Sequence, residues 1–233
     1  MTQNLVVVAH PDDEILGIGG TAKAYAEKGE IFTAVMVCSS VEARNARPAD
    51  NELRSDILRA AKICGFTEPV LGDFPNLTLN LVSHLSLVQF IEEQIRIFKP
   101  QRIFTHHPSD LNDDHRQVSK ACLAACRLFQ RASDIEIPLG SLYFMEVPSA
   151  TDWSFRGLGA SFEPDTFVDI TETFESKISG LEAYRGVMRP EPHPRSKQML
   201  KGLHSYRGGQ SGYLLAESFQ TVFRRGIGTI DLP

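Results

Sequence analysis

The chain has 233 residues and a formal net charge of −5 at pH 7, and its length suits one large α/β domain spanning residues 1–233. Its basic residues are scattered, which excludes a nucleic-acid footprint, and no apolar run approaches the roughly 20 residues that span a bilayer. Because no basic and apolar leader precedes the first strand, we expect a cytoplasmic protein.

The first predicted element is a buried strand that opens into an acidic loop. Apolar residues run without interruption over 6–9, and His10-Pro11-Asp12-Asp13-Glu14 follows at once. In open α/β sheets ligands bind at the carboxyl ends of the strands, so this loop is expected at an active-site crevice. His10 and Asp13 can offer a nitrogen and an oxygen to one divalent metal, while Asp12 stays free for proton transfer.

Strands and helices alternate in the next segment, which is typical of a parallel sheet. We expect a helix at 16–28, a strand at 31–38, a loop at 39–50, a helix at 51–64 and a short strand at 70–71. Arg54 on the second of these helices could bind a substrate oxygen or a phosphate. The alternative for Arg54 is a solvated or salt-bridged helix face.

A second polar cluster follows the strand expected at 102–105, after a helix at 85–98. Residues 106–115 hold three histidines and three aspartates just before a helix at 116–131. Parallel strands bring both polar loops to the same sheet edge, so His115 can supply the missing metal ligand. One carboxylate and two imidazoles leave coordination positions for water and substrate, which favours a catalytic zinc over a structural one.

The C-terminal part is less regular. Strands are expected at 141–147 and 166–170, and Trp153 between them is either a lid over the core or a stacking surface for a sugar ring. A helix is expected to about Tyr184, and helices at 197–206 and 212–223 end the chain. The proline-rich stretch 189–196 fixes an extended path from which His193 and Arg195 could reach the crevice.

These motifs resemble those of the LmbE-like, or PIG-L, zinc-dependent de-N-acetylases. Residues 9–14, Ala-His-Pro-Asp-Asp-Glu, match the first motif of that family without a departure, and Asp114-His115 matches the end of its second motif. The resemblance extends from residue 4 to about residue 130 and, more loosely, through 193–196. It implies an α/β, Rossmann-like fold, with an open, mostly parallel sheet and helices on both faces, and it implies amide hydrolysis.

The resemblance also assigns roles to single residues. It gives the ligand role to His10, Asp13 and His115, that of general base to Asp12, and an orienting role to Asp114. It implies Zn²⁺ as the cofactor. A metal ion of this kind lowers the pKa of a bound water toward about 7 and polarises a carbonyl.

The sequence departs from the family at Asn112, where many members have a histidine three residues before the last ligand. An amide can donate a hydrogen bond to an oxyanion but cannot protonate a leaving amine near neutral pH. The proton must then come from another group. Asp12 could return the proton that it took as a base, or His193 could supply one.

The expected function is therefore a zinc-dependent hydrolase that removes an acetyl or other acyl group from the amine of an N-acetylated, GlcNAc-type amino-sugar conjugate. One alternative is a magnesium-dependent phosphoester hydrolase, because carboxylate-rich sites suit that cation, although two histidine ligands argue against it. Another is a non-catalytic carbohydrate-binding protein of the same fold. The resemblance allows a homo-oligomer, and the sequence leaves open which sugar and aglycone are used.

Overall fold

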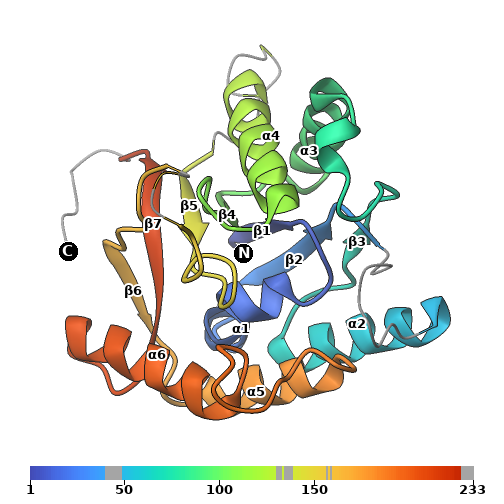
Figure 1. The fold of residues 1–233 in the computed structure, drawn as a ribbon. Coiled ribbons are helices and arrows are strands. Elements are labelled where there is room, and N and C mark those ends of the chain that lie inside the picture. Colours follow the sequence, from blue (N-terminus) through green and yellow to red (C-terminus); the bar gives the residue numbers. More distant parts are fainter. Residues whose placement is uncertain (40–48, 130–132, 134–138, 156, 158, 227–233) are drawn as a thin grey trace.

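The computed structural model describes residues 1–39, 49–129, 133, 139–155, 157 and 159–226, so most of the predicted loop at 39–50 lies outside it. Within these residues seven strands form one sheet in the order β3-β2-β1-β4-β5-β7-β6 (Figure 1). The strands are β1 (Gln3–Val8), β2 (Ile31–Met36), β3 (Val70–Leu71), β4 (Arg102–His106), β5 (Ser141–Met145), β6 (Thr166–Asp169) and β7 (Ala216–Arg224). The helices are α1 (Asp13–Ala26), α2 (Asp50–Cys64), α3 (His84–Phe98), α4 (Asp113–Phe129), α5 (Phe174–Ala183) and α6 (Lys197–Ser211), with a 3₁₀ turn η1 (Leu79–Leu81).

The strand order reverses between β1 and β4. β1 pairs in parallel with β2 on one side and with β4 on the other, and β5 continues in parallel beyond β4. The chain therefore leaves β1 toward β3 on one side and returns to β4 on the other, which makes a topological switch point. The loops after β1 and β4 both open there, as the sequence predicted. The mostly parallel α/β fold with helices on both faces is confirmed.

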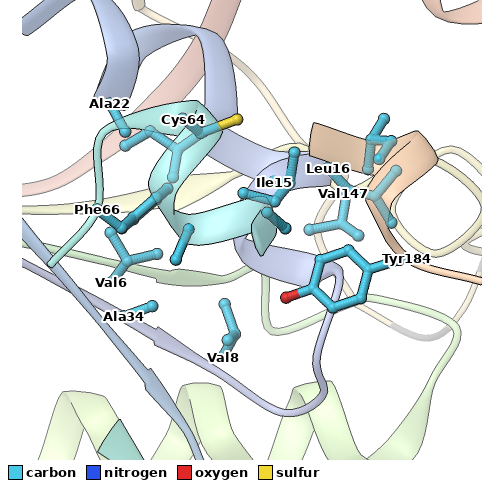
Figure 2. Packing of buried hydrophobic residues seen from close by; sticks show 14 of the residues in the cluster. Val6, Val8, Ile15, Leu16, Ala22, Ala34, Cys64, Phe66, Val147 and Tyr184 are labelled. Carbon is cyan, nitrogen blue, oxygen red and sulfur yellow. The ribbon is translucent and has the colours of Figure 1, made fainter. Parts of the chain in front are cut away.

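Two hydrophobic layers explain the uninterrupted apolar run of β1. Val6 and Val8 face the layer between the sheet and α1, α2 and α5, where they pack with Ile15 (Figure 2). Leu5 and Val7 point to the opposite face, into the layer beneath α3 and α4. A strand that is buried on both faces needs no polar alternation. Among the described helices, none has the length and apolar content that a membrane span requires.

The end of the chain differs from its prediction. The helix expected at 212–223 is wrong: this segment forms β7, which pairs antiparallel with both β5 and β6. Its first residues, Ala216, Glu217, Ser218 and Phe219, are all buried although two of them are polar, so the sequence shows no clear strand alternation that would separate this segment from a helix. The helix expected to end at 206 continues to Ser211, because Gly208 lets α6 approach the carbonyl oxygens of Tyr213 and Leu214. A Cβ at Gly208 would lie 2.6 and 2.8 Å from these two atoms.

A buried ion pair ties β7 to the first helix. Glu217 of β7 accepts hydrogen bonds from the backbone N–H groups of Gly20 (3.0 Å) and Thr21 (2.7 Å) inside α1. Lys177 of α5 donates to Glu217 (2.6 Å) and to the carbonyl oxygen of Leu16 (2.7 Å). Both charged side chains are almost fully buried, so each charge offsets the cost of removing the other from water. This contact fixes α1, whose N-terminus carries the first motif, against the end of the chain.

Candidate metal centre and active site

Three donor side chains converge at the switch point. Asp13 begins α1, His10 precedes it in the loop after β1, and His115 lies in the first turn of α4. Asp13 Oδ2 lies 3.3 Å from His10 Nδ1 and 3.2 Å from His115 Nε2, and the three ligand atoms lie within 4.8 Å of one another. These spacings suit one small cation between two imidazoles and a carboxylate, a donor set that fits zinc. The structure thus brings the three predicted ligands together.

Each histidine of this group has a carboxylate behind it. His10 Nε2 lies 3.0 Å from Asp114 Oδ2, and Asp114 itself accepts the backbone N–H groups of Leu77 (2.6 Å) and Leu79 (3.1 Å). His115 Nδ1 lies 3.0 Å from Asp110 Oδ2. A carboxylate that accepts the outer N–H of an imidazole leaves the lone pair of the other nitrogen facing inward, toward a metal. Asp114 therefore occupies the place expected of an orienting residue.

Asp12, in the same loop, is held by Arg195, an arginine that is distant in sequence. Arg195 Nη1 donates to Asp12 Oδ2 at 3.0 Å, and Arg195 Nε donates to Ser149 Oγ at 2.7 Å. Asp12 is 2 % exposed and borders the same cavity as the three donors. The sequence placed the segment that contains Arg195 near the crevice but gave Arg195 no role of its own.

The backbone around this site is strained at three places. Asp12 (φ 111°), Leu77 (φ 59°) and Ser149 (φ 69°) have positive φ values although none of them is a glycine. All three line the cavity. Such conformations cost on the order of 1–3 kcal/mol each and persist where the surroundings enforce them, which is common at functional sites. The contact of Arg195 with both Asp12 and Ser149 connects two of these residues.

The neighbouring carboxylates of the first motif have different environments. Burial opposes ionisation of Asp13, but the facing His115 and His10 outweigh it and hold the pKa of Asp13 well below its ordinary value. Burial raises the pKa of Glu14 to about 8, with a contribution from Asp12, although the hydroxyl of Tyr184 donates to it at 2.6 Å. Asp13 is therefore a permanent anion, while Glu14 is mostly protonated at neutral pH.

His10 and His115 carry positive charge that offsets the negative charge of Asp13. Burial alone would lower the pKa of His115, but Asp13 and Asp110 raise it to about 10. Burial also opposes protonation of His10, and its contacts with Asp114 and Asp13 raise its pKa above the ordinary value. A metal that binds here must displace protons from these rings.

The donors lie at the bottom of an open cavity of about 300 Å³. Its walls come from the loops after β1, β3, β4 and β5 and from the segment between α5 and α6. The lining residues are His10, Asp12, Asp13, Asn76, Leu77, Asn112, His115, Ser149, Ala150, Gly186, Arg189 and Arg195.

Asn112 is the only one of the remaining predicted site residues on this wall. Asn112 Oδ1 accepts the backbone N–H of Asp114 at 2.9 Å at the start of α4. His193 does not line the cavity; its ring packs against Trp153, with 5.2 Å between the ring centroids, and its Nδ1 accepts the backbone N–H of Arg195. The structure therefore places His193 and Trp153 beside each other and outside the cavity lining, so it does not support a substrate contact of Trp153 there.

Arg54 lies elsewhere. It is on α2, its side chain is 61 % exposed, and Arg54 Nη2 lies 3.5 Å from Glu68 Oε1. It does not line the cavity. The salt-bridged helix face, which was the alternative for Arg54, describes its position, and the structure does not support a substrate contact.

Sequence reasoning brought Arg195 near the crevice but missed its contact with Asp12, and it missed the role of Asp110. Asp110 was counted in the second polar cluster, five residues before His115, but a carboxylate at that spacing has no single expected role. Arg195 contacts Asp12 across 183 positions of sequence, and no local pattern predicts such a pair.

Comparison with known proteins gives a family. The model of the family described as PIG-L, GlcNAc-PI de-N-acetylase, matches residues 5–126. The uncharacterized deacetylase YaiS of Escherichia coli K12 is 30% identical over 149 residues, which cover 60% of this chain and 77% of that protein. A probable N-acetyl-alpha-D-glucosaminyl L-malate deacetylase 2 of Bacillus cereus is 26% identical over 205 residues, covering 83% and 88%.

A solved structure shows how broadly the fold is used. GalB, the 4-carboxy-2-hydroxymuconate hydratase of Pseudomonas putida KT2440, superposes with a TM-score of 0.78 at 20% identity, over 99% of this chain and 100% of that one. Such a likeness supports the fold and leaves the reaction to be argued from the site.

Proposed function

The chain belongs to the PIG-L, GlcNAc-PI de-N-acetylase, family, and on that premise we propose that it is a zinc-dependent hydrolase that removes an acetyl group from the amine of an amino-sugar conjugate. One observation carries this proposal: His10, Asp13 and His115 converge at the bottom of a cavity that the carboxylate of Asp12 also lines. A metal ion at the three donors would polarise the amide carbonyl and make a water acidic enough to react near neutral pH.

Zinc suits this donor set better than magnesium does. Two of the three donors are imidazoles, whereas magnesium prefers oxygen ligands and keeps several waters. Asp114 and Asp110 also fix the outer nitrogens of both rings, as is usual behind zinc-binding histidines. These features disfavour the alternative of a magnesium-dependent phosphoester hydrolase.

Asp12 is the proposed general base. Its Oδ2 is occupied by Arg195, so the carboxylate cannot turn freely, and it remains beside the donor group. In this position Asp12 takes a proton from the attacking water and passes it to the leaving amine. A non-catalytic carbohydrate-binding protein would not need a buried carboxylate held in a strained conformation beside the donors.

Asn112 is proposed to assist at the carbonyl oxygen. Its Oδ1 is already used by the N–H of Asp114, which leaves the amide NH₂ group as the part that can donate. A donor at this wall of the cavity would stabilise negative charge that develops on the amide oxygen.

The substrate is proposed to be an N-acetylated, GlcNAc-type conjugate. The B. cereus relative is named for such a substrate, and the cavity of about 300 Å³ is at the lower end of the roughly 300–1,000 Å³ usual for ligand pockets. A cavity of that size encloses one sugar ring and leaves the aglycone at the mouth. There Arg189 is exposed on the lining and could contact an anionic aglycone.

The test is a metal-loaded activity screen. The purified protein is stripped with a chelator, reloaded with zinc or magnesium, and incubated with N-acetylglucosamine, its malate conjugate and its nucleotide conjugates, and amine release is measured. The D12N variant serves as the control for contaminating activity. Amine release that needs zinc and Asp12 supports the proposal. Phosphate release with magnesium, or hydration of an unsaturated acid without amine release, would refute it.

A further inference from the structure

Asp110 connects the candidate metal centre to the loop that follows β5. Its carboxylate is fully buried, and each of its oxygens has a different partner. Oδ2 lies 3.0 Å from His115 Nδ1, and Oδ1 accepts the hydroxyl of Thr151 at 2.7 Å. The Thr151 hydroxyl in turn accepts the backbone N–H of Val147 at 2.9 Å. The chain of contacts therefore runs from the loop backbone through one hydroxyl and one carboxylate to His115.

We propose that Thr151 is a positioning residue that, through Asp110, fixes the orientation and tautomer of His115 and so sets the affinity of this centre for its metal. The Asp110 carboxylate can keep Oδ2 aligned with His115 only if Oδ1 is also held in place. Thr151 is the side chain that holds it, because its hydroxyl hydrogen is directed to Asp110 while its lone pair is occupied by Val147. This inference rests on the metal centre proposed above.

His106 limits the motion of the same ring by stacking on one of its faces. The rings of His106 and His115 stack with their centroids 3.8 Å apart at an angle of 21°. The backbone N–H of Ala9 donates to His106 Nε2 at 2.8 Å, so the hydrogen of this ring lies on Nδ1. That Nδ1 has no hydrogen-bond partner among the described residues and lies 3.7 Å from Asp110 Oδ2. His106 thus adds a buried N–H dipole near the carboxylate.

The group His106, Asp110 and His115 is also close enough to hold a second ion. Its geometry argues for positioning instead. The two rings are nearly parallel, so lone pairs at their Nδ1 atoms would not converge on one point. Both Nδ1 atoms also carry a hydrogen, because Ala9 donates to His106 Nε2 and His115 Nδ1 donates to Asp110.

The loop at 147–151 also contacts the residues that hold Asp12, the proposed base. Ser149 accepts Arg195 Nε, and Arg195 holds Asp12, while Ala150 accepts the backbone N–H of Leu111. One short loop therefore braces the metal ligand through Thr151 and the proposed base through Ser149. None of its residues is of a metal-ligand type, so no motif in the sequence indicates this role.

The experiment measures zinc affinity by competition with a chromophoric chelator, so its readout is independent of catalysis. Thr151→Val removes the hydroxyl at nearly constant volume, and we expect it to weaken zinc binding about 10- to 100-fold, the usual effect of losing a partner behind a ligand. Thr151→Ser keeps both hydrogen bonds and should bind zinc within about threefold of the wild type. Asp110→Asn should weaken binding at least as much as Thr151→Val.

Thr173→Val is the matched control. Thr173 is also a buried threonine, and its hydroxyl donates to the carbonyl oxygen of Gly20 at 2.8 Å, away from the cavity. It should lose some thermal stability and no zinc affinity. A second readout is the visible spectrum of the cobalt-loaded protein, which should shift in Thr151→Val and be normal in Thr151→Ser.

The outcomes separate this inference from the proposed function. If the wild type binds zinc and Thr151→Val binds it equally tightly, or if Thr173→Val loses the same affinity, Thr151 has only a structural role and the inference is overturned. If the wild type binds no zinc, the metal centre itself is wrong and the proposed function fails with it.

Discussion

Arg195 and Asp12 lie 183 residues apart in sequence, and Arg195 Nη1 contacts Asp12 Oδ2 at 3.0 Å beside the three metal-donor side chains. The segment after α5 thus completes a site whose donors all come from the first half of the chain. The arginine cannot replace the base, but it determines where the carboxylate points.

The first concerns Arg195 itself. Arg195→Ala should lower kcat about 10- to 100-fold with zinc content unchanged, because a hydrogen bond between charged groups contributes about 1.5–3 kcal/mol. Arg195→Lys should recover only part of the activity, since one ammonium group lacks the fork that reaches both Asp12 and Ser149. Steady-state kinetics together with elemental analysis test both variants. Loss of zinc in Arg195→Ala would contradict the assignment.

Asp12 and Asp13 should fail in different ways. Asp12→Asn should retain the metal and lose roughly 10² to 10⁴ in kcat, the usual contribution of general acid–base catalysis. Asp13→Ala should lose the metal, because Asp13 Oδ2 faces both histidines. Zinc content and kcat are measured on the same preparations. If Asp12→Asn emptied the site and Asp13→Ala left it filled, the two roles would have to be exchanged.

His193→Ala tests the origin of the proton that reaches the leaving amine. Burial and the neighbouring Arg195 and Arg189 lower the pKa of His193, so this ring is neutral at the pH where an acid is needed, and it does not line the cavity. We therefore expect kcat and the basic limb of the pH–rate profile to be unchanged, with Asp12 returning the proton. Loss of the basic limb in this variant would instead make His193 the acid.

Metal binding and stability should respond to pH in opposite directions. The pKa of His115 is raised to about 10 from an ordinary value of 6.5, so the metal-free protein gains stability that is complete below pH 6.5 and is lost as the pH rises toward 10. Zinc must displace this proton and any proton on His10, so its affinity should rise at least about tenfold per pH unit over the same range. Thermal unfolding of the metal-free protein and chelator competition at pH 6.5, 7.5 and 8.5 test both trends. A metal-free Tm that increases with pH would contradict them.

The ion pair between Lys177 and Glu217 should matter for stability and not for the reaction. Lys177→Met leaves Glu217 buried without its cation, and the loss of one partner of such a pair costs about 3–5 kcal/mol. The double variant Lys177→Met, Glu217→Gln should recover part of that loss. Urea unfolding of the zinc-loaded proteins provides the measurement. A single variant as stable as the wild type would show that the pair contributes little.

The sequence predicted those parts of the fold that depend on local patterns. The apolar run before His10 and the strand before His106 gave β1 and β4, and parallel pairing then placed both polar loops at one sheet edge. The three donors followed from that placement. The prediction failed at β7, because this segment mixes buried polar residues such as Glu217 with apolar ones and fits a strand only once its neighbours β5 and β6 are known.

The site beyond the donors was harder to predict, because it is built from pairs distant in sequence. Arg54 is a charged residue near the right loops, but the contact with Glu68 places it on the outer face of α2. Thr151 and Arg195 are ordinary polar residues until the fold brings them to Asp110 and Asp12. Their positions follow from tertiary packing, which no periodicity in the sequence records.

The contact of Glu217 with α1 makes the first half of the chain depend on its C-terminal strand, so the protein should not be divisible into independent fragments. Residues 5–126, which the family model matches, include every proposed ligand, yet Glu217, which accepts the Gly20 and Thr21 N–H groups, lies far outside that range. A fragment that ends at residue 126 removes this contact together with the strands β5 and β7 that continue the sheet beside β4, and it should not fold alone. Two fragments cut between α4 and β5 should instead reassemble when mixed, which would make zinc binding a direct reporter of fragment complementation.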